Sequence, residues 1–310
     1  MYKGSITQVS GIRVGHSDDP RALTGCSVVI CEEGATAGVS VRGASPGTRE
    51  TDVARDGNMV ERVNAVMLCG GSAFGLDACS GAMRFLEENA MGYDTGDTVV
   101  PIVMGAVIYD LNVGSCMVRP DARMGYEACE NADDRPEMEQ GAVGAGMGAT
   151  VGKALGTKGS MPGGIGTASL HLGGGVVVGA LVVVNAMGDV VDEYGDIIAG
   201  ARLPDGRYLD TWQALCSGMA QDLERSAGTN TTIGVVATNA ELTRAQAQRM
   251  AECAHDGMAM AIRPVHTMVD GDTIFGLSTG TKHADMIILC TAAAEVTARA
   301  IRNAIEALGE

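Results

Sequence analysis

Thr231 stands where a turn-prone segment, Gly228 to Asn230, runs into the apolar and β-branched run from Thr232 to Ala237. This pattern predicts a loop that becomes a strand at the threonine. If the Asn230–Thr231 peptide bond were broken, Thr231 would carry a nucleophilic hydroxyl and, on the same residue, a free α-amine able to act as its base. Threonines are common at such junctions, so this stretch alone does not establish that chemistry.

Two carboxylates stand close together in Asp270-Gly271-Asp272, a pattern that is also typical of an ordinary turn. The five histidines lack the spacing of metal ligands, which argues against a metal site. Nor do Ser, His and Asp occur in an order that supports a conventional catalytic triad. We therefore expect no metal.

A glycine-rich segment from Gly141 to Lys153 resembles a phosphate-binding loop but departs from it at two obligatory positions. Met147 stands where the first glycine is needed, and Ala154 stands where a serine or threonine is needed. A nucleotide-binding protein, either an oxidoreductase or a kinase, stays the alternative from a different functional class. Lys153 is of interest in itself, because dense glycines let a backbone approach an active centre closely.

The composition is that of an ordinary globular protein, since the 310 residues are 46% hydrophobic and 19% charged. A formal net charge of −16 argues against nucleic-acid and anionic membrane partners, because phosphate groups bind clustered lysines and arginines. The longest apolar run, Val176 to Val184, is too short to span a bilayer. The 44 glycines are about twice the average usage and predict many tight turns or close backbone approaches.

The nine cysteines are scattered and never form a CxxC pair, which argues against a disulfide framework or a zinc ribbon. We expect them to be buried thiols. The N-terminal residues Met1 to Ile6 lack the apolar core of a signal peptide. Together these features predict a cytoplasmic protein.

Apolar runs bounded by turn residues predict the elements that must position the polar side chains. Strands are expected at residues 12–14, 26–30, 38–41, 63–69, 176–184, 232–237 and 274–277. The 176–184 strand delivers Asn185 to its end, a favoured place for a site residue. Helices are expected at 76–86, after a capping box at Thr243 to Gln246, and at 285–308, with a helix or linker at 212–225.

The chain resembles the self-processing, P1-type aminopeptidase family that contains the L-aminopeptidase/D-esterases, the β-aminopeptidases and the nylon-oligomer hydrolases. The resemblance covers the full length, and its motifs follow one another in the right order. The matching stretches are residues 11–16 (GIRVGH), 46–52 (PGTRETD), 70–77 (GGSAFGLD), 144–153, 163–167 (GGIGT), 230–238 (NTTIGVVAT), 254–257 (AHDG) and 270–273 (DGDT).

This resemblance implies an α/β fold, a four-layer αββα sandwich of the N-terminal-nucleophile hydrolase type. The precursor of such proteins cuts itself before a Ser or Thr, which here implies cleavage of the Asn230–Thr231 bond. The expected product is a single domain over residues 1–310, made of an α chain, 1–230, and a β chain, 231–310. Neither a metal nor an organic cofactor is expected, and the αβ units are expected to form a homo-oligomer, a dimer or a tetramer.

The resemblance also implies a role for each of six residues: Thr231 as nucleophile, Asn185 in the oxyanion hole, Lys153 beside the nucleophile, Asp270 and Asp272 as orienting carboxylates, and Tyr109 near the substrate. An α-amine has an unperturbed pKa of about 8, so part of it is unprotonated at neutral pH and can take the hydroxyl proton. An amide donor aimed at the tetrahedral oxygen could stabilise the transition state by about 3 kcal/mol.

The implied function is an autoproteolytic amide hydrolase or aminopeptidase that forms an acyl-enzyme on Thr231. It would release α-, β- or ω-amino-acyl groups from small peptides or amides with a free amino group. Aminopeptidases of this family often have a Ser nucleophile and a Ser-Gly-acidic segment where this chain has Thr231 and Asp270-Gly271-Asp272. The present version is closer to the nylon-oligomer hydrolases, so endo-type cleavage of ω-amino acid oligomers is an alternative. An unprocessed, noncatalytic homologue is another.

Overall fold

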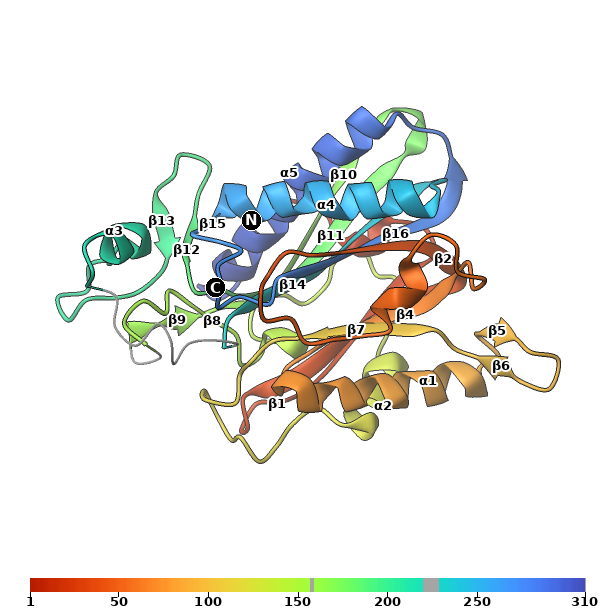
Figure 1. The fold of residues 1–310 in the computed structure, drawn as a ribbon, viewed down its shortest axis with the longest axis horizontal. Helices are drawn as coiled ribbons and strands as arrows, with labels where there is room; N and C mark the ends of the chain where they lie inside the picture. Colours follow the sequence, from red (N-terminus) through yellow and green to blue (C-terminus); the bar gives the residue numbers. More distant parts are fainter. Residues whose placement is uncertain (157–158, 220–228, 310) are drawn as a thin grey trace.

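The computed structural model describes residues 1–156, 159–219 and 229–309 (Figure 1). In these residues the α-helices are α1 (Ala78–Glu88), α2 (Ala122–Glu130), α3 (Thr211–Cys216), α4 (Arg244–Ala261) and α5 (Met286–Glu306). The helices predicted at 76–86 and 285–308 are therefore confirmed as α1 and α5. The predicted capping box is also confirmed, because the Thr243 hydroxyl accepts from Gln246 N while the Gln246 side chain accepts from Thr243 N.

The main sheet is mixed and contains strands from both halves of the chain. Its strands are β1 (Ile12–Asp19), β2 (Thr24–Val41), β3 (Thr48–Arg49), β4 (Val63–Cys69), β7 (Val103–Val107), β10 (Gly164–His171), β11 (Val177–Asn185), β14 (Thr231–Ala240) and β16 (Thr273–Lys282). They follow the order β10-β11-β14-β16-β2-β4-β7-β3, and β1 pairs with β2. The parallel pair β14–β16 lies between antiparallel neighbours, β11 and β2.

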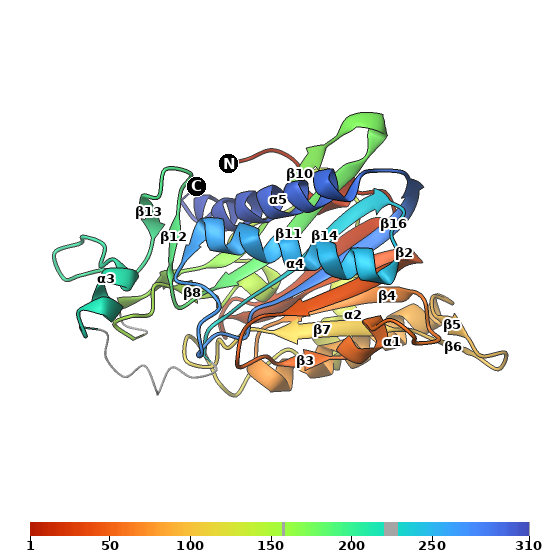
Figure 2. The ribbon, with the colours of Figure 1, turned by 45° about the horizontal axis from the view of Figure 1, so that its top comes forward.

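Smaller sheets lie outside this path. β5 (Tyr93–Asp94) pairs with β6 (Val99–Val100), and β8 (Thr150–Val151) pairs with β9 (Met161–Pro162). A third sheet joins β12 (Asp189–Val191) to β13 (Ile197–Ala199) and to β15 (Ile262–Arg263). Together with α3, β12 and β13 form a lobe at the end of the molecule where β8 lies (Figure 2). Helix α3 accounts for the start of the predicted helix or linker at 212–225, and residues 220–225 lie outside the described residues.

Strand β2 connects the two halves of the main sheet. It pairs with β4 through residues 26–30 and with β16 through residues 36–41, and its register with β4 shifts between Ile30 and Ala35. The prediction of two short strands at 26–30 and 38–41 is wrong, because the chain stays extended through the exposed Glu32 and Glu33. These two charged side chains interrupt the apolar pattern without interrupting the strand.

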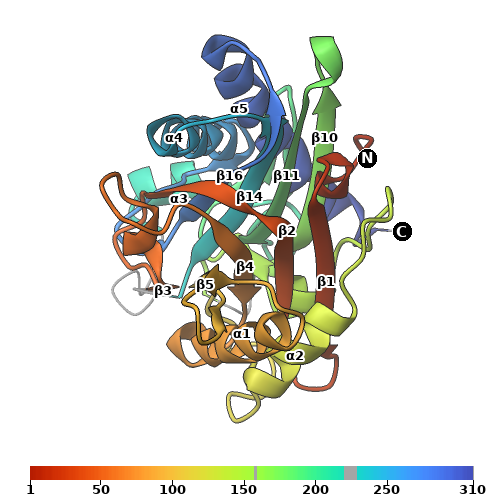
Figure 3. The same ribbon diagram turned by 90° about the vertical axis from the view of Figure 1, so that its right-hand side faces the viewer.

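Three of the apolar clusters in the described residues separate four layers, because alternate side chains of one strand face opposite sides of a sheet. Leu68, Leu181 and Phe275 belong to the core between the two halves of the sheet. Their neighbours Met67 and Val182 face outward, toward α1 and α2 in the first case and toward α4 and α5 in the second. The helix pairs thus cover opposite faces (Figures 1 and 3), and the predicted αββα arrangement is confirmed.

Glycines let helix α4 lie directly on the backbone of the sheet. A Cβ atom at Gly38 would lie 2.1 Å from the backbone nitrogen of Gln248, and one at Gly276 would lie 2.3 Å from the carbonyl oxygen of Ala247. No side chain fits at such distances, so glycine is required at both positions. The close backbone approaches predicted from the glycine content are therefore found between α4 and strands β2 and β16.

The cysteine prediction is correct for part of the set. The thiols of Cys26, Cys31, Cys69, Cys79 and Cys129 are buried, whereas Cys116 and Cys216 are exposed and the prediction is wrong for them. None of the helices in the described part of the chain combines the length and the apolar character that a bilayer crossing requires.

Candidate active site

Thr231 is the first residue of β14, and it lies directly across the sheet from Asn185, the last residue of β11. The two strands are antiparallel, so the pairing of Val184 with Thr232 and of Asn185 with Thr231 continues the ladder to its end. Thr231 is 3% exposed and Asn185 is fully buried. The strand register thus brings together two of the residues to which the sequence assigned a role.

The carbonyl group between Asn230 and Thr231 has two donors of its own. The Thr231 hydroxyl lies 2.5 Å from the Asn230 carbonyl oxygen, and the Gly271 backbone N–H donates to the same oxygen over 2.9 Å. A Cβ atom at Gly271 would lie 2.6 Å from the Ser45 carbonyl oxygen and 2.8 Å from the Thr231 hydroxyl oxygen. Position 271 therefore accepts no side chain without displacing one of these groups.

Lys153 reaches the same place from the glycine-rich segment and is only 6% exposed. Its ammonium group donates to the Asn185 side-chain oxygen over 2.8 Å, to the Asn185 carbonyl over 3.3 Å and to the Thr229 carbonyl over 3.1 Å. Burial lowers the pKa of Lys153 to about 7, while the charges of Asp270 and Asp110 act in the opposite direction. Neutral and charged forms of this amine therefore coexist near pH 7.

The Asn185 amide is fixed through both its atoms. Its oxygen accepts from Lys153 and from the backbone N–H of Thr150, and its nitrogen donates to the carbonyl oxygens of Tyr109 over 3.3 Å and Thr229 over 3.4 Å. The Lys153 ammonium group and the Asn185 amide nitrogen thus donate to the same acceptor, the Thr229 carbonyl oxygen. Tyr109 contacts the Asn185 amide through its backbone carbonyl, and Tyr109 is half-buried.

Asp270 is buried beside the start of β14, where it forms a parallel bridge with Asn230. One of its carboxylate oxygens accepts from the Thr267 backbone N–H over 2.8 Å and from the Thr267 hydroxyl. Burial, followed by the charge of the nearby Asp272 carboxylate, raises the pKa of Asp270 to about 6. The hydrogen bonds from Thr267 and the charge of Lys153 limit this increase.

Asp272 lies one step further along, at 1% exposure. One carboxylate oxygen accepts from the Thr232 backbone N–H over 2.7 Å. The other accepts from His266 twice, from its backbone N–H over 3.1 Å and from its ring Nδ1 over 2.7 Å. This carboxylate therefore links the residue after Thr231 to an imidazole that the sequence did not single out.

The structure thus gathers Thr231, Asn185, Lys153, Asp270 and Asp272 at one end of the central strands, with the Tyr109 backbone beside them. Sequence reasoning missed three groups at this site: the Gly271 N–H, the Thr229 carbonyl and the His266 ring. A glycine between two aspartates signals a close approach, which could have indicated Gly271. No signal in the sequence points to His266, because its contact with Asp272 depends on how the loop between them folds.

This arrangement can support acyl transfer. A hydroxyl lies against a carbonyl whose oxygen already accepts a backbone N–H, which is the geometry that stabilises negative charge on that oxygen. A buried amine with a pKa near neutrality is a suitable proton acceptor at physiological pH. In contrast, the segment that resembles a phosphate loop forms a three-residue 3-10 turn at Gly144–Gly146 and the short strand β8, without the helix N-terminus that holds phosphate in such loops.

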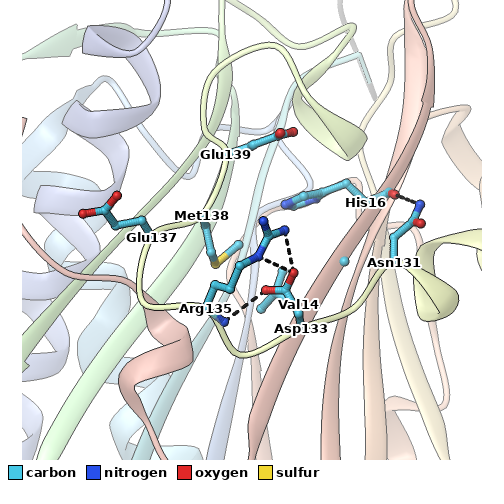
Figure 4. A pocket seen from close by; sticks show the side chains of 9 residues that line it. Val14, His16, Asn131, Asp133, Arg135, Glu137, Met138 and Glu139 are labelled. Carbon is cyan, nitrogen blue, oxygen red and sulfur yellow. Dashed lines mark hydrogen bonds and ion pairs between the residues drawn. The ribbon is translucent and has the colours of Figure 1, made fainter.

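A second polar region lies elsewhere, around β1 and the loop that follows α2 (Figure 4). It is a hollow of about 300 Å³ whose lining side chains are mostly charged or polar. Among them, Asp133 and Arg135 form an ion pair of 2.6 Å, and Asn131 donates to the His16 carbonyl over 3.0 Å. None of the six residues with a predicted role lines this hollow.

Comparison with known proteins identifies relatives along nearly the whole chain. The model of the family described as "Peptidase family S58" matches residues 4–308. An uncharacterized aminopeptidase of Mycobacterium leprae is 46% identical, over 90% of this chain and 80% of the relative. A 6-aminohexanoate-oligomer endohydrolase of Kocuria is 33% identical, over 87% of this chain and 73% of the relative.

Solved structures show the same fold. The L-aminopeptidase D-Ala-esterase/amidase of Ochrobactrum anthropi, described as a new variant among the Ntn hydrolase fold, superimposes with a TM-score of 0.73. The alignment covers 98% of this chain and 86% of that one at 20% identity. The likeness confirms the predicted fold type, and at this identity it concerns the fold alone.

Proposed function

This chain belongs to peptidase family S58 and is therefore a hydrolase of peptide or amide bonds, and we propose that it cuts its own Asn230–Thr231 bond and then uses Thr231 as its nucleophile. The observation that carries the proposal is the contact of the Thr231 hydroxyl with the carbonyl oxygen of that very bond, at 2.5 Å. Cleavage there would leave a single domain composed of residues 1–230 and 231–310.

In the proposed self-cleavage, the Thr231 hydroxyl oxygen attacks the Asn230 carbonyl carbon while its proton passes to the neutral amine of Lys153. The Gly271 N–H, 2.9 Å from the carbonyl oxygen, stabilises the negative charge that develops there. The C–N bond then breaks, and the nitrogen takes the proton that Lys153 received and becomes the α-amine of Thr231. The resulting ester between Asn230 and Thr231 is hydrolysed by water, which yields an Asn230 carboxylate and the free hydroxyl.

The residues before the cleaved bond occupy the donors that a substrate would need. The Thr229 carbonyl accepts from Asn185 over 3.4 Å and from Lys153 over 3.1 Å. Once the bond is cut, the new chain end can move away, and both donors can turn to the carbonyl of a substrate. In this state the α-amine of Thr231 acts as the base for its own hydroxyl, and Asn185 stabilises the oxyanion of the acyl-transfer step.

We infer that the substrates are small peptides or amides with a free amino group. The net charge of −16 favours cationic molecules over anionic ones. The relatives named above as an aminopeptidase and as a 6-aminohexanoate-oligomer endohydrolase fit such substrates. The proposal includes two modes of cleavage, which are the release of one amino-acyl group at a time and the internal cleavage of ω-amino acid oligomers. We also propose that the αβ units assemble as a dimer or a tetramer.

The test compares purified wild type with Thr231→Ser, Thr231→Ala and, as a control, Thr95→Ala, which alters an exposed threonine at the hairpin of β5 and β6. On a denaturing gel the wild type, the serine variant and the control should each give two fragments, and they should hydrolyse amides of α-, β- or ω-amino acids. The Thr231→Ala chain should stay whole and inactive. A wild type that stays whole yet hydrolyses amides would exclude this mechanism.

The mode of attack is decided by blocking the amino group. An enzyme that releases amino-acyl groups from the end of a substrate should lose activity when that amine is acetylated. An endo-acting enzyme should keep its activity on an acetylated 6-aminohexanoate oligomer and should produce internal fragments that chromatography resolves.

A further inference from the structure

His266 lies behind the site, between Asp272 and helix α4. Its ring Nδ1 is 2.7 Å from Asp272, its side chain is 17% exposed, and its ring meets that of His255 edge to face with centroids 4.7 Å apart. His255 is itself held, because its ring nitrogen Nε2 lies 3.0 Å from the Ser40 carbonyl oxygen. The imidazole of His266 is thus packed on one side and hydrogen-bonded on the other, so its orientation is fixed.

The backbone of His266 supports the same contact. Its φ angle is +56°, in the left-handed region, where asparagine, aspartate and histidine are the residues most often found besides glycine. This conformation turns the backbone N–H as well as the ring toward the Asp272 carboxylate, at 3.1 Å and 2.7 Å. Two hydrogen bonds from one residue to a single buried carboxylate indicate that the position of this carboxylate matters.

The position of Asp272 matters because β14 is paired up to Thr231 on its β11 side only, and its pairing with β16 does not reach Thr231 and Thr232. The backbone register of β14 with β16 begins at Ile233 and Thr273. On this side of the strand, the Thr232 N–H is instead held by the Asp272 side chain, at 2.7 Å. The remaining contact, from Gly271 N–H to the Asn230 carbonyl, belongs to the segment that cleavage separates from Thr231.

We infer that His266 is a positioning residue for the nucleophile, acting through Asp272 and the Thr232 N–H to hold the newly formed terminus at Thr231. The inference rests on the proposed function of Thr231. Chain termini fray unless they are tied down, and a displacement of about 1 Å at a reacting group can cost about 100-fold in rate. An anchor on the residue next to the nucleophile limits such a displacement.

The chemistry of the contact specifies which ring nitrogen of His266 donates the hydrogen bond to Asp272. An ionised Asp272 only accepts hydrogen bonds, so Nδ1 of His266 must carry the proton that it donates. An asparagine at position 266 would place its side-chain N–H close to the site of Nδ1, and asparagine tolerates a positive φ. A glutamine would instead place its N–H close to the site of Nε2, which faces away from Asp272.

The experiment therefore compares His266→Asn, His266→Gln and His266→Leu with the wild type, and includes His283→Leu as a control at an exposed histidine just after β16. Fragment formation is followed on a denaturing gel, and kcat and KM are measured on an aminoacyl amide and normalised to the amount of β chain. The leucine and glutamine variants should lower kcat by up to about 100-fold with KM nearly unchanged, and His266→Asn should restore most of it.

A double-mutant comparison tests the route through Asp272. If His266 acts by holding this carboxylate, His266→Leu should add little to the loss caused by Asp272→Asn. Two results would overturn the inference: leucine and glutamine variants as fast as the wild type, or an asparagine variant as slow as the leucine variant at an equal Tm. If His266→Leu does not fold, the asparagine and glutamine pair still decides between these results.

The same experiment separates this inference from the proposed function. A wild type that never forms two fragments would remove the proposed function, and the positioning role with it. A wild type that forms them, alongside position 266 variants that form them equally fast and are equally active, would remove the positioning role alone.

Discussion

Two polar regions of this chain use the same residue types in opposite surroundings. Around Thr231, the charged residues Lys153 and Asp270 are 6% and 2% exposed. In the hollow of Figure 4, the side chains of Arg135 and Asp133 are 77% and 37% exposed. The first region takes its charges out of water, whereas the second leaves them in it.

The pKa values follow this difference. Burial raises the pKa of Asp270 to about 6 and lowers that of Lys153 to about 7, so both groups can exchange protons near neutral pH. In the hollow, the hydrogen bond from Arg135 lowers the pKa of Asp133, which therefore keeps its charge. Buried charges without full compensation cost stability. The comparison supports the proposed catalytic role of the charges near Thr231, whereas the pair in the hollow is an ordinary surface ion pair.

The largest expected effect separates two asparagines, one from each region. Asn185→Ala should lower kcat for amide hydrolysis by about 100- to 1000-fold, because in the proposed mechanism it removes the donor to the developing oxyanion. Asn131→Ala removes the hydrogen bond to the His16 carbonyl in the hollow and should leave kcat unchanged. Rates are measured per β chain formed. Equal rates for both variants would break the distinction between the two regions.

Lys153→Met should change the pH dependence of stability. The folded-state pKa of about 7 lies below the ordinary 10.5, so the unfolded chain binds more protons between these values and stability rises with pH there. The buried amine thus destabilises the fold most at and below pH 7. The variant should gain unfolding free energy relative to wild type at pH 6.5, and this gain should shrink by about 3 kcal/mol by pH 9.5. Denaturant titrations at both pH values measure it, and a constant difference would argue against a buried lysine of low pKa.

Asp270→Asn and Asp133→Asn should respond to pH in opposite directions. The pKa of Asp270 is raised from 3.8 to about 6, so wild-type stability falls as the pH rises between these values, and the asparagine variant should gain about 2 kcal/mol relative to wild type between pH 4 and pH 7.5. The pKa of Asp133 is lowered, so its contribution is present at neutral pH and lost on acidification. Its asparagine variant should therefore lose stability relative to wild type as the pH rises toward about 3.8, and the difference should stay nearly constant between pH 4 and pH 7.5. Parallel trends for the two variants would contradict the assigned surroundings.

The smallest expected effect is that of Arg135→Gln. Its guanidinium is exposed and pairs with Asp133 two residues away, and such pairs contribute little to stability. Neither the Tm nor the rate of fragment formation should change. A marked loss of processing in this variant would show that the hollow communicates with the site around Thr231.

Much of the fold could be predicted from the sequence, because local patterns carry the information. The capping box at Thr243 placed the start of α4, and the apolar run from 176 to 184 placed β11 within one residue. The continuity of β2 could not be predicted, since its Glu32 and Glu33 look like a turn and are tolerated because they are exposed. The folding of one sheet into two layers could not be predicted from the sequence either, because it depends on the pairing of β2 with both β4 and β16.

The candidate site is harder to derive than the fold. The side chains around Thr231 come from separate segments of the chain, and the sequence motifs do not specify how far apart these segments lie in the fold. The pairing of Asn185 with Thr231 depends on strand register, which the sequence does not state. Lys153 ends a segment whose glycines suggested a close approach, and its side chain is buried. His266 remained hidden because its role depends on a loop conformation with a positive φ angle.

The most direct test of the central claim is the intact mass of the polypeptides in purified wild-type protein under denaturing conditions. The account predicts two species, residues up to Asn230 and a β chain that begins at Thr231 with a free α-amine. Fragments that meet at any other bond, or a chain that stays whole after prolonged incubation at neutral pH, would contradict it.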